Sequence, residues 1–465
     1  MNKIFEAIAN VFRIPDLRRR VLFTLGLLAV YRIGAHIPTP GIDAGALERF
    51  FERSAGTLFG FMDLFSGGQF RRLTIFALGI MPYITASIIL QLLTVVVPTL
   101  EKLQKEGELG RRKITQWTRY LTVGLSAVQS FGIASLLMGS EGNFVLNPGP
   151  GFIAMTMLTL TTGTAFIMWL GEQITERGIG NGMSLIIFAG IVVNLPDVIQ
   201  NIGENMRTGQ WGVPVLLVLL VAMVAVVAFV VLVERGERRI PVQYAKRVVG
   251  RRMMGGQSTH LPLKVNAGGV IPVIFASSIL TFPQTLNQVE WVRANRYLSS
   301  LLNSISYGEP LYVLLYVVGI VFFAFFYVSI IFNPTEVADN MRKYGGFIPG
   351  IRPGKRTAEH MNEILTKVTL VGGLYLALLS VIPDFLIAGI RVHHLPGIGA
   401  WFDSWVPRMI LEGLNVRFYF GGTTLLIVVG VAMDTVNQIE AQLIMRHYEG
   451  FAPKSGRIRG RRAGF

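Results

Sequence analysis

GIMPYITASIIL (Gly79–Leu90) and GVIPVIFASSIL (Gly269–Leu280) align without a gap, and these two apolar stretches decide the fold. A second pair also aligns, GMSLIIFAGI (Gly182–Ile191) with GTTLLIVVGV (Gly422–Val431). Chance similarity between apolar helices is the alternative explanation. Gly-x-x-Pro followed by Ala-Ser at matched positions favours an internal repeat instead.

The composition around these stretches is that of a membrane protein. Of the 465 residues, 51% are hydrophobic and 15% are charged, where a soluble domain carries about 25% charged residues. The mean hydropathy is +0.51, which excludes an ordinary soluble enzyme. Since a helix crosses the bilayer in about 20 residues, the chain is predicted to be all-α and polytopic, with ten transmembrane helices. The predicted spans are 20–38, 72–97, 119–138, 152–171, 183–203, 213–233, 267–285, 311–332, 366–387 and 417–434.

Both repeat pairs are separated by five spans, and an odd separation turns the second half upside down. The predicted organisation is therefore two inverted five-helix halves around a central pore. They are an N-terminal half (1–205), a C-terminal half (206–440) and a basic tail (441–465).

The distribution of basic residues predicts the orientation. The 43 Lys and Arg residues divide about three to one in favour of the side that holds both termini, which places the termini in the cytoplasm. The first apolar run is long enough to span and has no small-residue cleavage site, so it is expected to be retained. Before it, Ile4–Phe12 has the spacing of an amphipathic helix on the cytoplasmic interface.

The repeat also nominates residues at its centre. Ile84 matches Ile274, and Ile187 matches Ile427. A solute transporter would offer carboxylates, hydroxyls or unwound carbonyls at this place. Branched apolar side chains instead favour a constriction that excludes water and ions by dewetting and closes around a variable passenger. Ordinary helix packing is the alternative interpretation of these isoleucines.

Three further segments stand out. TLFGFMDLFSGGQF (Thr57–Phe70) has an apolar helical face but is too short to span, so it either re-enters the membrane or lies on the interface. The loops 234–264 and 333–365 are long and basic, and the runs near Val242–Tyr244 and Val248–Val249 predict a projecting hairpin in the first. Such charge fixes topology and attracts anionic lipids. The length of the loops favours docking of an acidic or RNA-bearing partner.

Motifs for covalent chemistry are missing. The sequence contains no Walker motif, no His-Glu-x-x-His and no Gly-x-Ser-x-Gly. It contains no cysteine, and His393-His394 is interpreted as a solvated pair and not as a metal site. No cofactor or metal is expected, and the energy for any transport must come from a partner or a gradient.

Several motifs resemble the SecY/Sec61α family of protein-conducting channels, in its bacterial form, over nearly the whole chain. They include YRIGAHIPTPGID (Tyr31–Asp43), EGELGRRKITQWTRY (Glu106–Tyr120), MWLGEQITERGIGNG (Met168–Gly182), FNPTEVADN (Phe332–Asn340) and PGIRPG (Pro349–Gly354). The outer segment 391–415 is longer than in the shorter family members, and no role is assigned to it.

The resemblance implies a set of site residues. The pore ring would be Ile80, Ile84, Ile187, Ile191, Ile274 and Ile427. The plug would comprise Thr57, Leu58, Phe61, Leu64, Phe65, Gly67 and Gly68. The lateral gate, between spans 2–3 and 7–8, would include Ser87, Gln91, Gln129, Asn266 and Phe282. Binding of the ribosome or motor would use Lys246, Arg247, Arg251, Arg252 and Arg352.

The function implied is passage of unfolded secretory polypeptides across a bacterial plasma (inner) membrane, with release of apolar segments into lipid. The implied partners are the membrane subunits SecE and SecG, the SecA motor ATPase, the ribosome, signal sequences and unfolded preproteins, and anionic lipids. An inverted-repeat transporter for a small solute is the main alternative, and a membrane-embedded enzyme is the third.

Overall fold

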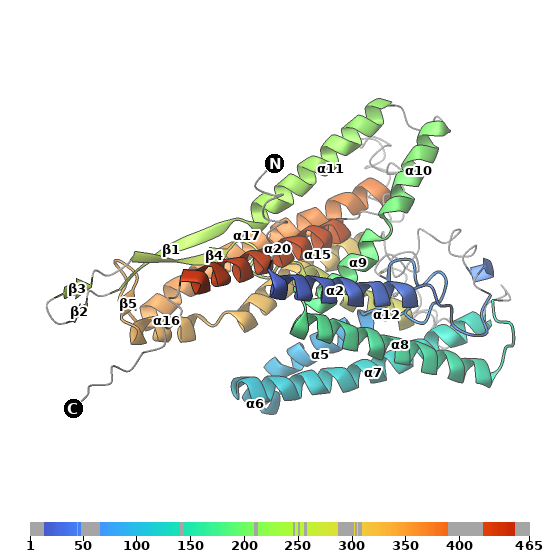
Figure 1. The fold of residues 1–465 in the computed structure, drawn as a ribbon, viewed down its shortest axis with the longest axis horizontal. Coiled ribbons are helices and arrows are strands. Elements are labelled where there is room, and N and C mark those ends of the chain that lie inside the picture. The colour runs from blue at the N-terminus through green and yellow to red at the C-terminus, as the bar shows by residue number, and fades with distance from the viewer. Residues whose placement is uncertain are drawn as a thin grey trace, which may run out of the picture.

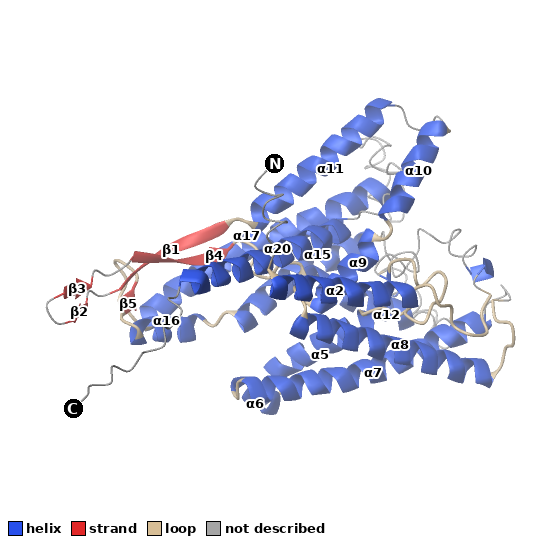
Figure 2. Ribbon diagram, in the orientation of Figure 1, coloured by secondary structure: helices blue, strands red, loops and turns tan. Residues whose placement is uncertain are grey.

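The structure is a computed structural model. It describes residues 14–43, 45–47, 66–139, 144–208, 213–244, 247–249, 252–254, 258–286, 302, 305, 309–388 and 422–451. Helices dominate this part of the chain, and a small group of strands projects from one end of the bundle (Figure 2). The expected helix at Ile4–Phe12, the outer segment 391–415 with His393-His394, and most of the tail lie outside the described residues.

Each of the ten predicted spans contains a helix (Figure 1). The helices are α2 (Pro15–Gly34), α5 (Met81–Val96), α7 (Glu108–Gly139), α8 (Pro150–Arg177), α9 (Gly182–Val192), α11 (Val213–Glu234), α12 (Ile271–Leu286), α15 (Pro310–Ile331), α17 (Lys355–Ala388) and α20 (Gly422–Phe451). Within the described residues, five of them (α7, α8, α15, α17 and α20) include stretches long and apolar enough to cross a membrane alone. Helix α5 and the short α6 (Pro98–Lys105) give a sixth candidate if the pair, bent by 104°, counts as one span.

The extent of two predicted spans is wrong. Residues 72–80 form turns, and α5 begins only at Met81, because Gly79 has a left-handed φ of +56° that interrupts a helix. The fifth span stops at Val192, and a separate helix, α10 (Leu195–Arg207), follows it. Proline in the first turn of α10 lacks the N–H that a continuous helix would need.

The backbone confirms the internal repeat. Helices α5 and α12 have 16 residues each and start two residues after the matched Gly79 and Gly269. Those glycines have φ values of +56° and +58°. Helices α9 and α20 both begin at the glycine that the alignment pairs, Gly182 and Gly422. The two members of each pair pack against one another, so the centre of the repeat is also the centre of the molecule.

The strands join the two long loops. Strand β1 (Glu237–Tyr244) pairs antiparallel with β4 (Ser258–Lys264), and β2 (Arg247–Val249) pairs with β3 (Arg252–Met254) beyond them. The predicted hairpin is therefore confirmed. The sequence pattern did not predict β5 (Gly346–Phe347), which comes from the second loop and pairs with β1.

Both loops thus form one body, made of β1 to β5, α16 (Pro334–Lys343) and the first turns of α17. We call it the cytoplasmic extension, after the side on which the charge distribution predicts it to lie. It has its own apolar core, in which the buried residues include Ile240, Val242, Leu263, Met341 and Met361. The extension projects from the end of the bundle that also carries α6 (Figure 1). The charge distribution predicts that this end is cytoplasmic.

Candidate functional site

Six isoleucines from four elements of both halves pack in one apolar cluster at the centre of the bundle. They are Ile80, Ile84, Ile187, Ile191, Ile274 and Ile427. All except the partly buried Ile84 are at most 9% exposed. Val270 and Val431, which the repeat matches to Ile80 and Ile191, belong to the same cluster. The described residues where the two halves meet are therefore branched apolar side chains, the residue type expected of a constriction that resists water and ions.

Local structure fixes the helices that carry these side chains. Ile80 is the N-cap residue of α5, and a proline in the first helical turn supplies a pre-set backbone angle there. Asn181 caps α9, because its side-chain oxygen accepts from the N–H groups of Met183 and Ser184. The backbone of Gly182 lies so close to Gly171 of α8 that an added Cβ would be 1.9 Å from that carbonyl oxygen. Helix α9 is therefore held firmly against α8.

The end of the expected plug lies beside the isoleucine cluster. Thr57, Leu58, Phe61, Leu64 and Phe65 fall outside the described residues, while Gly67 and Gly68 are described, and both have positive φ. A Cβ on Gly67 would lie 2.6 Å from the carbonyl oxygen of Gly190, one residue before the cluster member Ile191.

Gln69, the next residue after these glycines, is tied to α2. Its Nε2 donates to the hydroxyl of Tyr31 at 2.6 Å, and both side chains are buried. The sequence does not predict this pair, because nothing in the local pattern relates residues so far apart in the chain. Segment 66–70 is thus anchored between α2 and α9.

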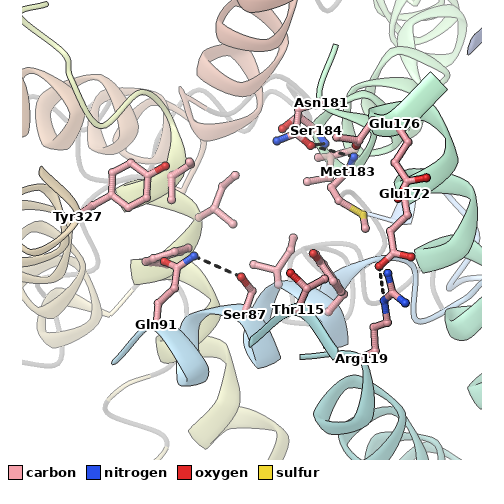
Figure 3. A pocket seen from close by; sticks show the side chains of 17 residues that line it. Ser87, Gln91, Thr115, Arg119, Glu172, Glu176, Asn181, Met183, Ser184 and Tyr327 are labelled. Atoms are coloured by element: carbon pink, nitrogen blue, oxygen red, sulfur yellow. Dashed lines mark hydrogen bonds and ion pairs between the residues drawn. The ribbon is translucent and has the colours of Figure 1, made fainter. Parts of the chain in front are cut away.

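A cavity of about 420 Å³ opens on the predicted cytoplasmic side of the cluster. Its apolar lining includes three cluster members, Ile84, Ile187 and Ile274. Its polar wall carries an ion pair, in which Arg119 of α7 lies 2.7 Å from Glu172 of α8. Figure 3 shows Glu172, Glu176 and Asn181 on one side of this space and Gln91 and Tyr327 on the other. Polar walls above an apolar floor suit a passage that receives a hydrated chain.

The expected gate residues are only partly brought together. Gln91 donates to Ser87 one turn earlier on α5, at 3.4 Å, and both line the cavity. Gln129 is half-buried on α7 and lies outside the cavity lining. Phe282 lies in α12, but its side chain is outside the described part.

The hydrogen bond of Asn266 to another side chain is made outside the expected lateral gate. It bonds to Glu234, the last residue of α11, with its Nδ2 2.6 Å from Oε1 of the carboxylate. In the sequence, Glu234 stands out only as an acidic residue at the end of a long apolar run, which does not predict its bond to Asn266.

Of the expected binding residues, those that the structure describes lie in or beside the cytoplasmic extension. Arg352 is exposed in the turn before α17. Arg247 and Arg252 lie in the paired strands β2 and β3, while Lys246 and Arg251 are outside the described residues. Across the described chain, no three His, Cys, Asp or Glu side chains group together as a metal site requires.

The fold and the site define a class of protein: a polytopic helical membrane protein with a cluster of branched apolar side chains where its two inverted halves meet. A family model described as SecY matches residues 74–436. The chain belongs to the SecY family.

Curated relatives are similar over almost the whole chain. "Protein translocase subunit SecY" of Escherichia coli K12 is 50% identical over 450 residues, which cover 96% of each chain. The protein of the same name from Vibrio cholerae is 48% identical over 95% of each chain. That of Streptomyces griseus is also 48% identical, over 96% of this chain and 100% of the relative.

Solved structures share the fold at low identity. "The structure of a protein conducting channel" superimposes with a TM-score of 0.63 at 18% identity, covering 93% of this chain and 94% of the other. Sec61 in a canine ribosome-channel complex gives a TM-score of 0.61 at 17% identity, with the same coverage. At this level of identity the likeness establishes the fold alone.

Proposed function

We propose that this chain is the pore subunit of a protein translocase, which conducts unfolded secretory polypeptides across the membrane and releases apolar segments sideways into lipid. The observation that carries the proposal is the cluster of six isoleucines sealed between the two halves. The relatives that are about half identical to the chain carry the name of protein translocase subunits. The small-solute transporter fits less well, since the described residues that meet at the centre are branched apolar side chains, whereas a solute site would offer charged or hydrogen-bonding groups there.

The isoleucine ring would work by shape and not by specific bonding. Passengers vary in sequence, so a seal with charged or hydrogen-bonding groups would retain some of them and repel others. Isoleucine side chains offer neither, and they can repack around an extended chain at a cost of dispersion contacts alone. When the passenger leaves, the same side chains close and exclude water.

The proposed lateral gate lies where the halves meet, between α5 and α7 on one side and α12 and α15 on the other. Helices α5 and α12 touch, and α7 and α15 flank them in their own halves. Ser87, Gln91, Gln129, Asn266 and Phe282 are assigned to this gate. Polar side chains along the seam would lower the cost of separating the helices, because water can replace their bonds.

The chain is proposed to be a passive channel driven by a partner. Its sequence has no nucleotide-binding motif, so the work of export would come from the SecA motor ATPase or the ribosome. The basic cytoplasmic extension, with Lys246, Arg247, Arg251, Arg252 and Arg352, is the proposed docking surface. Two structural neighbours come from ribosome complexes, canine Sec61 and yeast Ssh1. SecE and SecG are the proposed membrane subunits.

The proposed location is the bacterial plasma membrane, with both termini in the cytoplasm. Support comes from the distribution of Lys and Arg, about three quarters of which lie on the side of the termini. The same positive surface suits anionic lipid headgroups.

Reconstitution tests the function. The chain is incorporated into vesicles with its small membrane subunits, and motor, ATP and a preprotein with a signal sequence are added outside. Protease-protected preprotein that requires both this chain and ATP is expected. Vesicles that hold the intact chain and motor but never protect preprotein would contradict the proposal.

A further inference from the structure

The turns before α5 and α12 have the same backbone but different anchors. In the N-terminal half, the N–H of Gly79 donates to the carbonyl of Phe76 at 2.8 Å. In the C-terminal half, the N–H of Gly269 donates to the carbonyl of Asn266 at 3.4 Å. Phe76 and Asn266 therefore occupy the same position in the repeat, and one is aromatic where the other is an amide.

The N-terminal turn is held by an aromatic stack. Phe76 is 3% exposed and stacks on Tyr31 of α2, with ring centroids 5.9 Å apart and planes at 12°. Its other neighbour is Phe166 of α8, at 5.9 Å and 13°. Gly34 admits the ring, because a Cβ there would lie 2.1 Å from it. Water cannot replace such contacts, so this anchor favours a fixed turn.

The C-terminal turn is held by a polar bond to the corresponding helix of its own half. Asn266 is 5% exposed, and its Nδ2 donates to Glu234 at 2.6 Å and to the carbonyl of Gly269 at 3.1 Å. Glu234 is the last residue of α11 and is half-buried. A charge-assisted bond of this kind is strong while it is shielded, yet water can take over both partners once they separate.

This polar bond lies at the base of the cytoplasmic extension. The pairing of β1 with β4 runs back to Glu237 and Lys264, and the N–H of Val265 donates to the carbonyl of Gly236 at 2.9 Å. Going inward toward the bundle, Asn266 directly follows Val265, and Glu234 is separated from Gly236 by Arg235 alone. A force transmitted along the β1–β4 hairpin therefore reaches this bond.

Few residues separate the bond between Asn266 and Glu234 from the isoleucine cluster. Gly269 follows Asn266 by three residues, and the ring member Ile274 lies in the first turn of α12, where its N–H donates to Val270 at 3.2 Å. Val270 in turn lies against α20, because a Cβ on Gly430 would be 3.0 Å from its side chain. A displacement of the turn must therefore move Ile274 relative to α20.

We infer that Glu234 is a positioning residue, which holds the turn before α12 in its sealed position through Asn266. The bond opens when a partner loads the cytoplasmic extension, while the aromatic stack keeps the matching turn of the N-terminal half in place. Opening is thus asymmetric, and α12 is the moving side. The inference rests on the proposed translocase function and adds to it the link between the docking surface and the seal.

Substitution tests the link. Glu234→Leu and Asn266→Leu each remove the hydrogen bond between the two side chains. Loss of a hydrogen bond to a charged group shifts an equilibrium by about tenfold or more. Each variant is expected to raise export of a preprotein with a defective signal sequence about tenfold, and the double variant no further. Glu234→Gln keeps an acceptor and should restore part of the stringency. Glu204→Leu is the matched control, since that exposed glutamate lies on α10, outside the cytoplasmic extension, and it should change nothing.

A cross-link tests whether the bond must open. The chain has no cysteine, so Glu234→Cys with Asn266→Cys gives a unique pair. Because the two side chains meet at their tips, the shorter cysteines are joined with a short bifunctional methanethiosulfonate reagent. The link should form in the idle channel and block export of a normal preprotein, and a reductant should restore it. Export through the reduced pair tests the proposed function separately. Full export through the linked channel, while single-cysteine controls behave alike, would overturn the inference.

Discussion

Gly79 and Gly269, at matched positions of the repeat, share a left-handed backbone conformation, with φ of +56° and +58°. Each turns the chain into the helix that carries ring residues, α5 in one half and α12 in the other. Residues with a Cβ adopt this conformation only at a cost. The same backbone device therefore starts the central helix of both halves.

Alanine at either glycine should destabilise the protein by about 1–2 kcal/mol. The cause is conformational, since a Cβ at Gly269 meets no atom within 4 Å and one at Gly79 has its first neighbour at 3.9 Å. Gly124→Ala is the control, because this glycine lies inside helix α7 with open space around it. Thermal unfolding in detergent should show a lower unfolding temperature for the first two variants. The third variant should show no decrease. Equal effects at all three positions would count against backbone strain.

Ile427→Asn should loosen the seal. Ile427 is fully buried in the ring cluster, and an amide without a partner there costs about 1–3 kcal/mol. The sealed state loses that energy, while an open, hydrated pore does not. Ion conductance of the idle channel and export of preproteins with poor signals should both rise. Val436→Asn, at an exposed site on the same helix, should leave both unchanged, and a normal seal in Ile427→Asn would argue against the ring.

Tyr31→Phe should release the segment that follows the expected plug. The change keeps the stack on Phe76 but leaves the buried amide of Gln69 without its partner, at a cost of about 1–3 kcal/mol. A higher ion leak is expected. Tyr120→Phe is the matched control, because Tyr120 accepts a bond from Gln116 at an exposed site. If both variants seal as tightly as the parent, the anchor has no role in closure.

Gly163→Ala should force α8 away from the turn before α5. A Cβ there would lie 1.8 Å from the carbonyl oxygen of Ile75, and backbone cannot yield as a flexible side chain can. Overpacking of this kind costs about 1–3 kcal/mol. The check is thermal unfolding beside Gly151→Ala, a glycine near the start of α8 with nothing within 4 Å. Unchanged stability of Gly163→Ala would mean that the helices are not so closely packed.

Much of the fold could be predicted from local pattern. Apolar runs predicted ten spans, each of which overlaps a described helix, and the repeat nominated Ile84, Ile187, Ile274 and Ile427, which the structure packs together. The predicted start of span 2 at residue 72 is too early, because an apolar run does not reveal that Gly79 has a positive φ.

Pairings distant in sequence could not be predicted. The bond from Asn266 to Glu234 and that from Gln69 to Tyr31 depend on how whole helices come together. The strand pair Gln243 with Phe347 joins two loops between which the described helices α12 and α15 lie. No periodicity within either loop encodes that pairing.

The most direct test of the central claim places a single cysteine at Ile84, Ile187, Ile274 or Ile427 in the cysteine-free chain. A secretory polypeptide with one cysteine is then stalled during export, and disulfide formation is scored. Val221 on α11, 56% exposed, supplies the control position, which should not link. Links from all four ring positions are predicted, because the passenger threads between the isoleucines. Absence of links at all four, in a channel that holds the stalled passenger, would contradict the account.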